Sequence, residues 1–356
     1  MKPEAGFKGK IQAVNGMSRL TYTSKPVRFS LSRAFNPAPA NFMTLRLGIM
    51  FGRHYCADTF WNQCEGALGR QGDVEIALNR RDVDHLLVFE NPGAPDCSDR
   101  YPQWKNWLLQ AMGHTVAAIR ARAGWEWLGL PREKVTLLFY EPPNFIKDGQ
   151  IALAHRHAAA VYGPDRRCQH PIRLPVTWNV AGHVKALRAE PPGKEHAALV
   201  AVTSGKLHLP GHKERMAFFQ ALRDAGVDLR LFGRNLPMTL EPGGQLMDKG
   251  SVLRPARFAL AIENHAGGDL YVTEKIWDAL LCWCLPLYYG SGAAEKMIPP
   301  EAFVRLPDLG ARGIETVKQT MADPGLWERR LDAIAEARRR ILGPLRLVEW
   351  MVKQLR

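Results

Sequence analysis

The sequence predicts an α/β protein with two doubly wound, mostly parallel sheets that face each other across a cleft. Three observations predict this class. Short apolar runs alternate with helical patterns, which is typical of parallel sheets with helical crossovers. A break rich in proline and glycine at residues 189–194 divides this alternation. The length of 356 residues is enough for two domains of about 150 residues each.

The first domain is expected over residues 44–190, after an N-terminal extension. Residues 1–43 are rich in Pro, Ser, Lys and Asn and show no sustained period, so they are interpreted as lying outside the core. Apolar runs predict the strands of this domain, and apolar residues at helical spacing predict a helix between the second and third strands. The strands are expected at 43–50, 86–89 and 135–140, and the helix at 104–123.

The second domain is expected over residues 195–325, where the same alternation resumes. Strands are predicted at 197–203, 227–232, 258–262 and 285–289, with helices at 214–225 and from residue 273. Two such Rossmann-like domains in one chain are the GT-B type of architecture. Ligands bind at the carboxyl ends of the strands in sheets of this kind, so the residues that follow strands are the best site candidates.

Residues 326–356 are predicted to form a basic helical tail. Apolar residues recur on one face of this segment, and Gly343-Pro344 is expected to interrupt the helix. The favoured interpretation is a helix that packs back on the body of the protein. The alternative is a peripheral helix on a membrane surface.

Composition limits the partners and the compartment. Lys plus Arg is 48 and Asp plus Glu is 35, which gives a net charge of +13 and favours phosphate-bearing ligands or simply a solvated basic face. The absence of zinc-finger spacing and of sequence-specific DNA motifs argues against a nucleic-acid partner. The six cysteines form no C-x-x-C pair. With no signal-peptide pattern and no run of 18 apolar residues, a reduced, cytoplasmic protein is expected.

Four histidines in the middle of the chain raise the question of a metal site. His155, His157, His170 and His183 lack the accompanying carboxylates and the fixed spacing of a metal-binding motif. We therefore predict ordinary polar or surface roles for them and no metal site.

The most informative segment of the sequence is 257–279. A buried strand ends in Glu263-Asn264, a glycine-rich loop follows, and Tyr271 precedes a helix that starts at Glu274-Lys275 and that Thr273 can cap. Free N–H groups at a helix start and a nearby lysine favour an anion, and a carboxylate can accept hydrogen bonds from sugar hydroxyls. These groups suit a nucleoside diphosphate. The alternative is a surface loop with an incidental ion pair.

This segment resembles the donor-binding motif of the α-1,3-fucosyltransferases, Phe-x-Leu-x-Phe-Glu-Asn-Ser followed by a short loop and Tyr-Val-Thr-Glu-Lys. The resemblance continues in Leu-Pro-Leu-Tyr-Tyr-Gly at 285–290 and in Ile-Pro-Pro-Glu-Ala-Phe at 298–303. Upstream, Ala-Val-Thr-Ser at 201–204, followed by Arg215, is similar to the family's Ser-Asn…Arg element. The similar region runs from about 198 to 306.

The resemblance implies a function and a role for each matching residue. The implied reaction is inverting transfer of L-fucose from GDP-β-L-fucose to a hydroxyl of a glycan or glycoconjugate acceptor. The second domain would bind the donor and the first the acceptor. No cofactor would be required, although a divalent metal could stimulate the reaction. The implied roles are pyrophosphate binding for Arg215 and Lys275, hydrogen bonds to phosphate or sugar for Asn264 and Tyr271, and ribose binding for Glu274.

The first domain would supply the base that removes the acceptor proton. The run Leu137–Pro143 resembles the family's strand ending in Glu-x-Pro, which implies that Glu141 is this base. Glu90, in Phe-Glu-Asn-Pro, has the same local setting and is the alternative base. Either residue could instead be an exposed glutamate at a strand end.

Departures from the family pattern leave the donor sugar open. His265 stands where the family usually has Ser, the loop from Asn264 to Tyr271 is about one residue longer, and Thr-Ser-Gly at 203–205 replaces the usual Ser-Asn. The alternatives are a GT-B enzyme that uses another nucleotide sugar, a nucleotide-binding protein without catalysis, and, least favoured, a nucleic-acid-binding protein.

Overall fold

The computed structural model describes residues 44–51, 57–66, 69–78, 80, 82–89, 130–207, 210–323 and 325–355. The helix expected at 104–123, the extension 1–43 and the alternative base Glu90 lie outside these residues. Thr44–Arg356 forms one compact unit.

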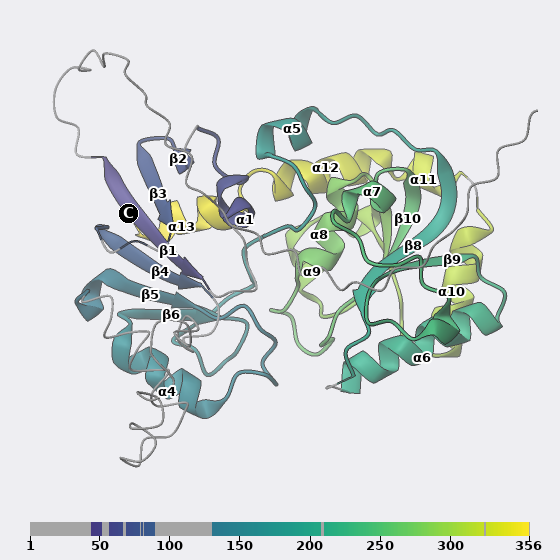
Figure 1. The fold of residues 1–356 in the computed structure, drawn as a ribbon, viewed down its shortest axis with the longest axis horizontal. Helices are drawn as coiled ribbons and strands as arrows, with labels where there is room; N and C mark the ends of the chain where they lie inside the picture. The colour runs from purple at the N-terminus through teal and green to yellow at the C-terminus, as the bar shows by residue number, and fades with distance from the viewer. Residues whose placement is uncertain are drawn as a thin grey trace, which may run out of the picture. The chain divides into compact units, whose positions relative to one another are not determined.

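Within the described residues, the first sheet has the strand order β2-β3-β1-β4-β5-β6-β7 (Figure 1). All neighbouring strands are parallel except the pair β2–β3. The strands are β1 (Leu45–Phe51), β2 (Arg70–Gln71), β3 (Val74–Leu78), β4 (His85–Phe89), β5 (Val135–Leu138), β6 (Ala160–Gly163) and β7 (His170–Pro171).

Both faces of the first sheet are covered by helices. Successive side chains of a strand point to opposite faces, so each strand contributes to the core on both sides. On one face Leu86 packs in a cluster with Ile151 of α4 (Asp148–His157). On the other face Leu47 packs in a cluster with Phe60 of α1 (Asp58–Trp61) and Met351 of α13 (Leu347–Leu355). The C-terminal helix therefore belongs to the core of the first sheet, far from it in sequence.

The second sheet has the order β12-β11-β10-β8-β9, and its neighbouring strands are all parallel. Helices α6 and α10 pack together on one face, and α8 and α12 pack together on the other (Figure 1). The bounds are β8 (His196–Ser204), α6 (Pro210–Asp224), β9 (Leu229–Arg234), β10 (Ala256–Ile262), α8 (Glu274–Leu281), β11 (Leu285–Tyr289), β12 (Val304–Arg305), α10 (Ala311–Met321) and α12 (Leu331–Ile341).

Short helices connect or flank these elements. They are η4 (Arg132–Lys134), α5 (Val184–Ala189), η5 (Met238–Leu240), α7 (Gly250–Leu253), α9 (Ala293–Met297), η6 (Pro300–Ala302) and α11 (Leu326–Arg329). The segment between α5 and β8 has no regular structure, and this is where the sequence predicts a break.

The strand order of the second sheet reverses between β8 and β10. From β8 the chain moves first to β9 on one side and then to β10 on the other. Such a reversal opens a crevice at the carboxyl ends of the two central strands, which is where open α/β sheets bind ligands. The predicted α/β, doubly wound fold class is confirmed, whereas the exact domain boundaries stay predictions.

The C-terminal tail packs on the body of the protein. Helices α12 and α13 are separated at Gly343-Pro344, as the sequence predicts. Ile334 and Ile341 of α12 are buried in the core of the second sheet, and Leu347 of α13 is buried in that of the first. The described part of the chain contains no helix with the length and apolar character of a membrane span. Peripheral membrane contact stays a prediction.

Candidate functional site

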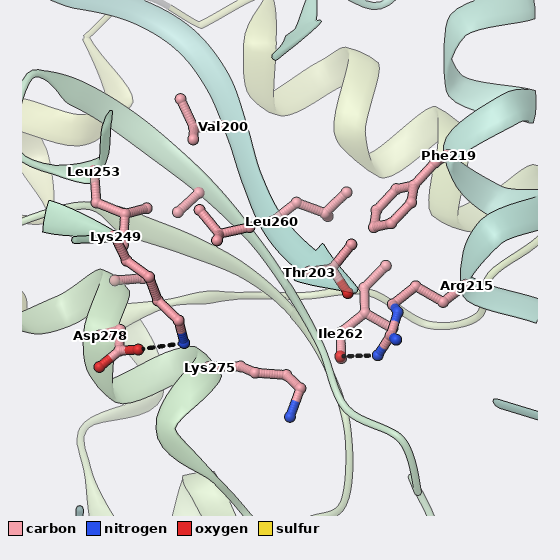
Figure 2. A pocket seen from close by; sticks show the side chains of 13 residues that line it. Val200, Thr203, Arg215, Phe219, Lys249, Leu253, Leu260, Ile262, Lys275 and Asp278 are labelled. Atoms are coloured by element: carbon pink, nitrogen blue, oxygen red, sulfur yellow. Dashed lines mark hydrogen bonds and ion pairs between the residues drawn. The ribbon is translucent and has the colours of Figure 1, made fainter. Parts of the chain in front are cut away.

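Arg215 lies at the point where the strand order of the second sheet reverses. Its guanidinium group donates to Oδ1 of Asn264 at 2.7 Å and is 3.5 Å from the carbonyl oxygens of Ile262 and Ser204. It therefore joins the carboxyl ends of β8 and β10 (Figure 2). The side chain is 2% exposed, and its Nε has no hydrogen-bond partner among the described residues. Burial lowers the pKa of Arg215, but the group keeps its charge because guanidinium titrates so high.

Gly211 allows helix α6 to bring Arg215 to this position. A Cβ atom at residue 211 would lie 2.6 Å from the carbonyl oxygen of Asn264, which is too close for any other residue type without movement of the backbone. The first turn of α6 can therefore approach the end of β10, and Arg215 follows one turn later.

Two lysines line the same crevice as Arg215. Lys275 comes from the start of α8, and Lys249 immediately precedes α7 (Figure 2). Thr203, at the carboxyl end of β8, and Asp278, on α8, also line this crevice. Three basic side chains from separate segments therefore face one crevice, a charge distribution that favours a phosphate-bearing ligand.

The start of α8 is already occupied by a carboxylate of the protein. Glu263 accepts hydrogen bonds from the backbone N–H of Thr273 at 2.8 Å and from its hydroxyl, and Lys275 Nζ lies 3.1 Å from Glu263 Oε2. The expectation that the Thr273 side chain caps α8 is therefore wrong, because its hydroxyl donates to Glu263 and makes no cap bond. This helix terminus is neutralised internally, so Arg215 is the better-placed cation for a diphosphate.

Glu274 lies between the two lysines of the crevice. Its Oε1 is 3.6 Å from Nζ of Lys249 and 3.7 Å from Nζ of Lys275. Burial opposes ionisation of Glu274, but the charges of Lys275 and Lys249 outweigh it and lower the pKa of Glu274 to about 2. An ionised carboxylate held in this way can accept hydrogen bonds from ligand hydroxyl groups.

Tyr271 packs against the segment that leads to Glu141, although the two come from different halves of the chain. Tyr271 is 3% exposed and packs in the apolar cluster that contains Tyr140, at the end of β5. Burial raises the pKa of Tyr271 well above its usual value, and the charges of Glu263, Glu274 and, to a lesser extent, Glu141 add to this shift. Glu141 itself is half-buried, two residues after Phe139. The structure thus brings the expected base near the segment that carries the donor-site motif.

The carboxylates of the second half also act on the first half. Burial raises the pKa of Tyr140, and the charges of Glu274 and Glu263 add to the shift. The Tyr140 hydroxyl donates to the Pro175 carbonyl at 2.7 Å and accepts from Thr177 at 3.1 Å. These bonds fix the segment that precedes Glu141 against the chain that leads toward the second sheet.

Of the residues predicted for the site, Arg215, Asn264, Glu274 and Lys275 gather at the carboxyl edge of the second sheet. Tyr271 packs with Tyr140, the residue that precedes Glu141. Glu90 lies outside the described residues. The sequence did not single out Lys249 or Asp278, and it noted Glu263 without a role. No sequence motif marks Lys249. Its partners, Glu274 and Asp278, lie about one turn apart on α8, which begins 25 residues after Lys249 in the chain.

Two of the four histidines considered as metal ligands, His170 and His183, make contacts to other side chains or to the backbone. His170 stacks on Tyr162, and His183 accepts from the N–H of Lys185 at the start of α5. Within the described ranges, no three His, Cys, Asp or Glu residues come together as metal ligands would. Stimulation by a divalent metal stays a prediction.

Part of the chain is similar to a known protein family. Residues 193–314 match the family model described as Glycosyltransferase family 10 (fucosyltransferase) C-term. Over these residues the chain is similar to that family. The matched segment contains Arg215, the whole donor-type motif and the strands β8 to β12.

Two curated fucosyltransferases are similar to part of this chain. The α-(1,3)-fucosyltransferase FucT of Helicobacter pylori is 34% identical over 99 residues, which are 28% of this chain and 20% of that protein. The α-(1,3)-fucosyltransferase 7 of Bos taurus is 35% identical over 107 residues, which are 28% of this chain and 29% of that protein. The similarity therefore spans less than a third of either relative.

A solved structure shares the arrangement of the two sheets. It is an α-glucosyltransferase in complex with UDP and a 13-mer DNA containing a mismatch, with a TM-score of 0.59, 9% identity, and coverage of 88% of this chain and 100% of that chain. At this level of identity the likeness concerns the fold alone, which is the two-domain GT-B glycosyltransferase architecture.

Proposed function

We propose that this protein is an inverting fucosyltransferase that transfers L-fucose from GDP-β-L-fucose to a hydroxyl group of a glycan acceptor. The observation that carries the proposal is the position of Arg215. Its buried guanidinium bridges the ends of β8 and β10, where the strand order reverses, inside the segment that matches the family-10 model. The named relatives that match this segment are α-(1,3)-fucosyltransferases.

The basic crevice suits the chemistry of a nucleoside diphosphate leaving group. As the bond between fucose C1 and the β-phosphate oxygen breaks, negative charge grows on the diphosphate. A fixed guanidinium beside it stabilises this charge more strongly than mobile water does. Arg215 would meet the diphosphate, Asn264 would hold Arg215 in orientation, and Glu274 would accept hydrogen bonds from the ribose hydroxyls.

Glu141 would act as the general base. The acceptor oxygen attacks C1 of fucose from the face opposite GDP, and GDP leaves with the bonding electron pair. The proton of the acceptor hydroxyl passes to the Glu141 carboxylate. Attack from the opposite face converts the β-linked donor into an α-linked product. The packing of Tyr271 in one cluster with Tyr140 supports this role, because Glu141 follows Tyr140 directly in the chain.

The first test of this proposal varies the donor. Purified protein would be incubated with GDP-fucose, GDP-mannose, UDP-glucose or UDP-galactose and a panel of oligosaccharide acceptors, and products would be identified by mass spectrometry. We expect a mass increase of one deoxyhexose with GDP-fucose. Transfer from a different donor instead would keep the glycosyltransferase fold and contradict the assignment of fucose, which His265 leaves open.

The second test concerns the base. Glu141→Gln should keep the affinity for GDP-fucose and lower the turnover rate by about a hundredfold to ten-thousandfold, because general-base catalysis contributes this much. Glu133→Gln, at an exposed position of the same half, is the matched control and should retain the parent rate. If Glu141→Gln had the parent rate and Glu90→Gln were inactive, Glu90 would be the base. GDP binding without turnover in any form would indicate a non-catalytic protein.

A further inference from the structure

Lys249 stands between two carboxylates of α8. Its Nζ donates to Asp278 Oδ2 at 2.7 Å and lies 3.6 Å from Glu274 Oε1. Residues 274 and 278 are four apart, so they lie on one face of the helix, where like charges repel. Lys249 comes from the segment before α7 and places a positive charge between them. Lys249 therefore connects Asp278 and Glu274 within the crevice.

Asp278 gives Lys249 a fixed support. This carboxylate is 1% exposed, and its Oδ1 accepts the backbone N–H of Asn179 at 2.7 Å and that of Val180 at 3.2 Å. Both its oxygens are therefore engaged, one by the backbone and one by Lys249. A lysine held at such an anchor loses much of the freedom of an exposed side chain, so its position relative to Glu274 is constrained.

Glu274, in contrast, is more exposed than Asp278 and can be reached by a ligand. Its side chain is 23% exposed, and its Oε1 faces Lys249 and Lys275 at distances longer than hydrogen bonds. These two lysines approach from different segments and hold the carboxylate by charge without using all its acceptor capacity. A carboxylate oxygen has several lone-pair sites, so Glu274 can still accept hydrogen bonds from two vicinal hydroxyls.

We infer that Lys249 is a positioning residue that orients Glu274 to receive the ribose hydroxyls of the nucleotide donor. The inference rests on the proposed function and deepens it. It assigns to Lys249 a role that acts through Glu274 and so depends on the ribose, not on the diphosphate. Lys275, which is bonded to Glu263 and Thr273, supports Glu274 from the other side.

The charged and titratable groups around Glu274 define the expected pH behaviour. Lys275 and Asp278 act on it from α8, Lys249 from the segment before α7, Arg215 from α6, Tyr271 from the loop before α8, and Tyr140 from the first half. With Lys249 present the pKa of Glu274 is about 2, so the carboxylate stays ionised from pH 8 to 5. Without Lys249, the effect of burial is less opposed and the pKa rises. The carboxylate then protonates at a higher pH than in the parent, although Lys275 still opposes this, so ribose binding weakens first on the acid side.

The test compares nucleotides that differ only in the ribose. Affinities of GDP, 2′-deoxy-GDP and 2′,3′-dideoxy-GDP would be measured by calorimetry for the parent, Lys249→Met, Lys249→Arg and the control Lys318→Met, an exposed lysine of α10. We expect Lys249→Met to weaken GDP binding about tenfold, the typical size of a lost charged hydrogen bond. Its affinity for dideoxy-GDP should equal that of the parent. Lys249→Arg should restore most of the GDP affinity.

Several results would overturn the inference. GDP affinity unchanged in Lys249→Met would show that Lys249 does not act on the site. An equal loss for GDP and dideoxy-GDP would show a general structural effect. If Lys249→Met did not fold, Lys249→Gln would be measured at pH 8 and pH 5. The ratio of the GDP affinity of Lys249→Gln to that of the parent would be compared at the two pH values. An equal ratio at pH 8 and pH 5 would contradict the inference. If the parent protein bound no GDP, the proposed function itself would be contradicted. This outcome can be told apart from a failure of the Lys249 inference, because it is seen with the parent protein alone.

Discussion

At the scale of single residues, Arg215 combines burial, charge and a free donor. Its guanidinium contacts oxygens at the ends of two strands, and its Nε is unpartnered among the described residues. Arg215→Lys keeps the charge but removes the planar fork that reaches several oxygens at once. We expect GDP affinity to fall about tenfold to a hundredfold, because hydrogen bonds to charged groups are worth about 1.5–3 kcal/mol. Calorimetry with GDP measures this change.

The control for Arg215→Lys is Arg223→Lys, on the same helix. Arg223 pairs with Glu241 and lies two turns further along α6, at the end away from the strand ends. Its substitution should leave GDP affinity unchanged. Equal effects of the two substitutions would mean that Arg215 acts on the stability of α6 and not on the ligand.

Sequence patterns reveal individual site residues when these lie in one local motif. Asn264, Tyr271, Glu274 and Lys275 fall within twelve consecutive residues, so a single resemblance marks them all. Lys249 could not be predicted in this way, because its partners belong to a helix that packs on it only in the folded chain. The partner of a charged side chain is a tertiary property, and charge spacing along the chain does not determine it.

The start of α8 shows how a single element is stabilised. Thr273 donates its backbone N–H and its hydroxyl to Glu263, and Lys275 donates to the Thr273 hydroxyl at 2.9 Å. Thr273→Val keeps the branched shape and removes the hydroxyl, which leaves buried polar groups short of a partner. We expect the free energy of unfolding to fall by about 1–3 kcal/mol, as measured by urea denaturation.

Thr316→Val is the matched control for the Thr273 substitution. The Thr316 hydroxyl makes an exposed hydrogen bond to the Arg312 carbonyl within α10, and surface changes of this kind usually alter stability by less than about 0.5 kcal/mol. A Thr273→Val protein as stable as Thr316→Val would contradict the view that the Glu263–Thr273–Lys275 group stabilises the helix start.

Elements differ in how well the sequence predicts them. The buried central strands, such as β8 and β10, are continuous apolar runs, and they were predicted to within two residues at each end. The strands β3 and β6 were missed, because Val74–Leu78 and Ala160–Gly163 are short and contain polar or small residues. Their pairing with longer neighbours, rather than local propensity, makes them strands.

At the scale of the whole unit, the chain passes between the two sheets twice. The segment after β7 leads into the second half, and the segment between α12 and α13 returns to the first. The two segments pair where they pass: the N–H of Val176 donates to the Leu345 carbonyl at 2.7 Å, and the N–H of Leu347 donates to the Val176 carbonyl at 2.9 Å. The two cores are therefore expected to unfold together, although they are separate apolar clusters.

Arg346 is a buried charged residue at the place where the two segments that connect the sheets pair with each other. It is 1% exposed, donates to the Gln63 carbonyl, and lies 2.8 Å from Glu65 Oε1 and 2.7 Å from Glu349 Oε1. Arg346→Met removes these bonds at once. The two carboxylates are half-exposed and regain water, so the cost should be nearer that of the lost bonds than that of a buried unpaired charge, about 2–3 kcal/mol in the free energy of unfolding.

Urea denaturation followed by tryptophan fluorescence and by circular dichroism measures this cost and the cooperativity together. The control is Arg339→Met on α12. The Arg339 side chain is exposed and, within the described part of the chain, pairs with Glu336 alone, so its loss should change little. If Arg346 stabilises the contact between the two connecting segments, Arg346→Met lowers the urea midpoint. It also separates the transition seen by fluorescence from that seen by circular dichroism, because α13 detaches from the first sheet before the second sheet unfolds. A midpoint equal to that of Arg339→Met, with coincident transitions, would show that apolar packing of Leu347 and Met351 alone ties the halves together.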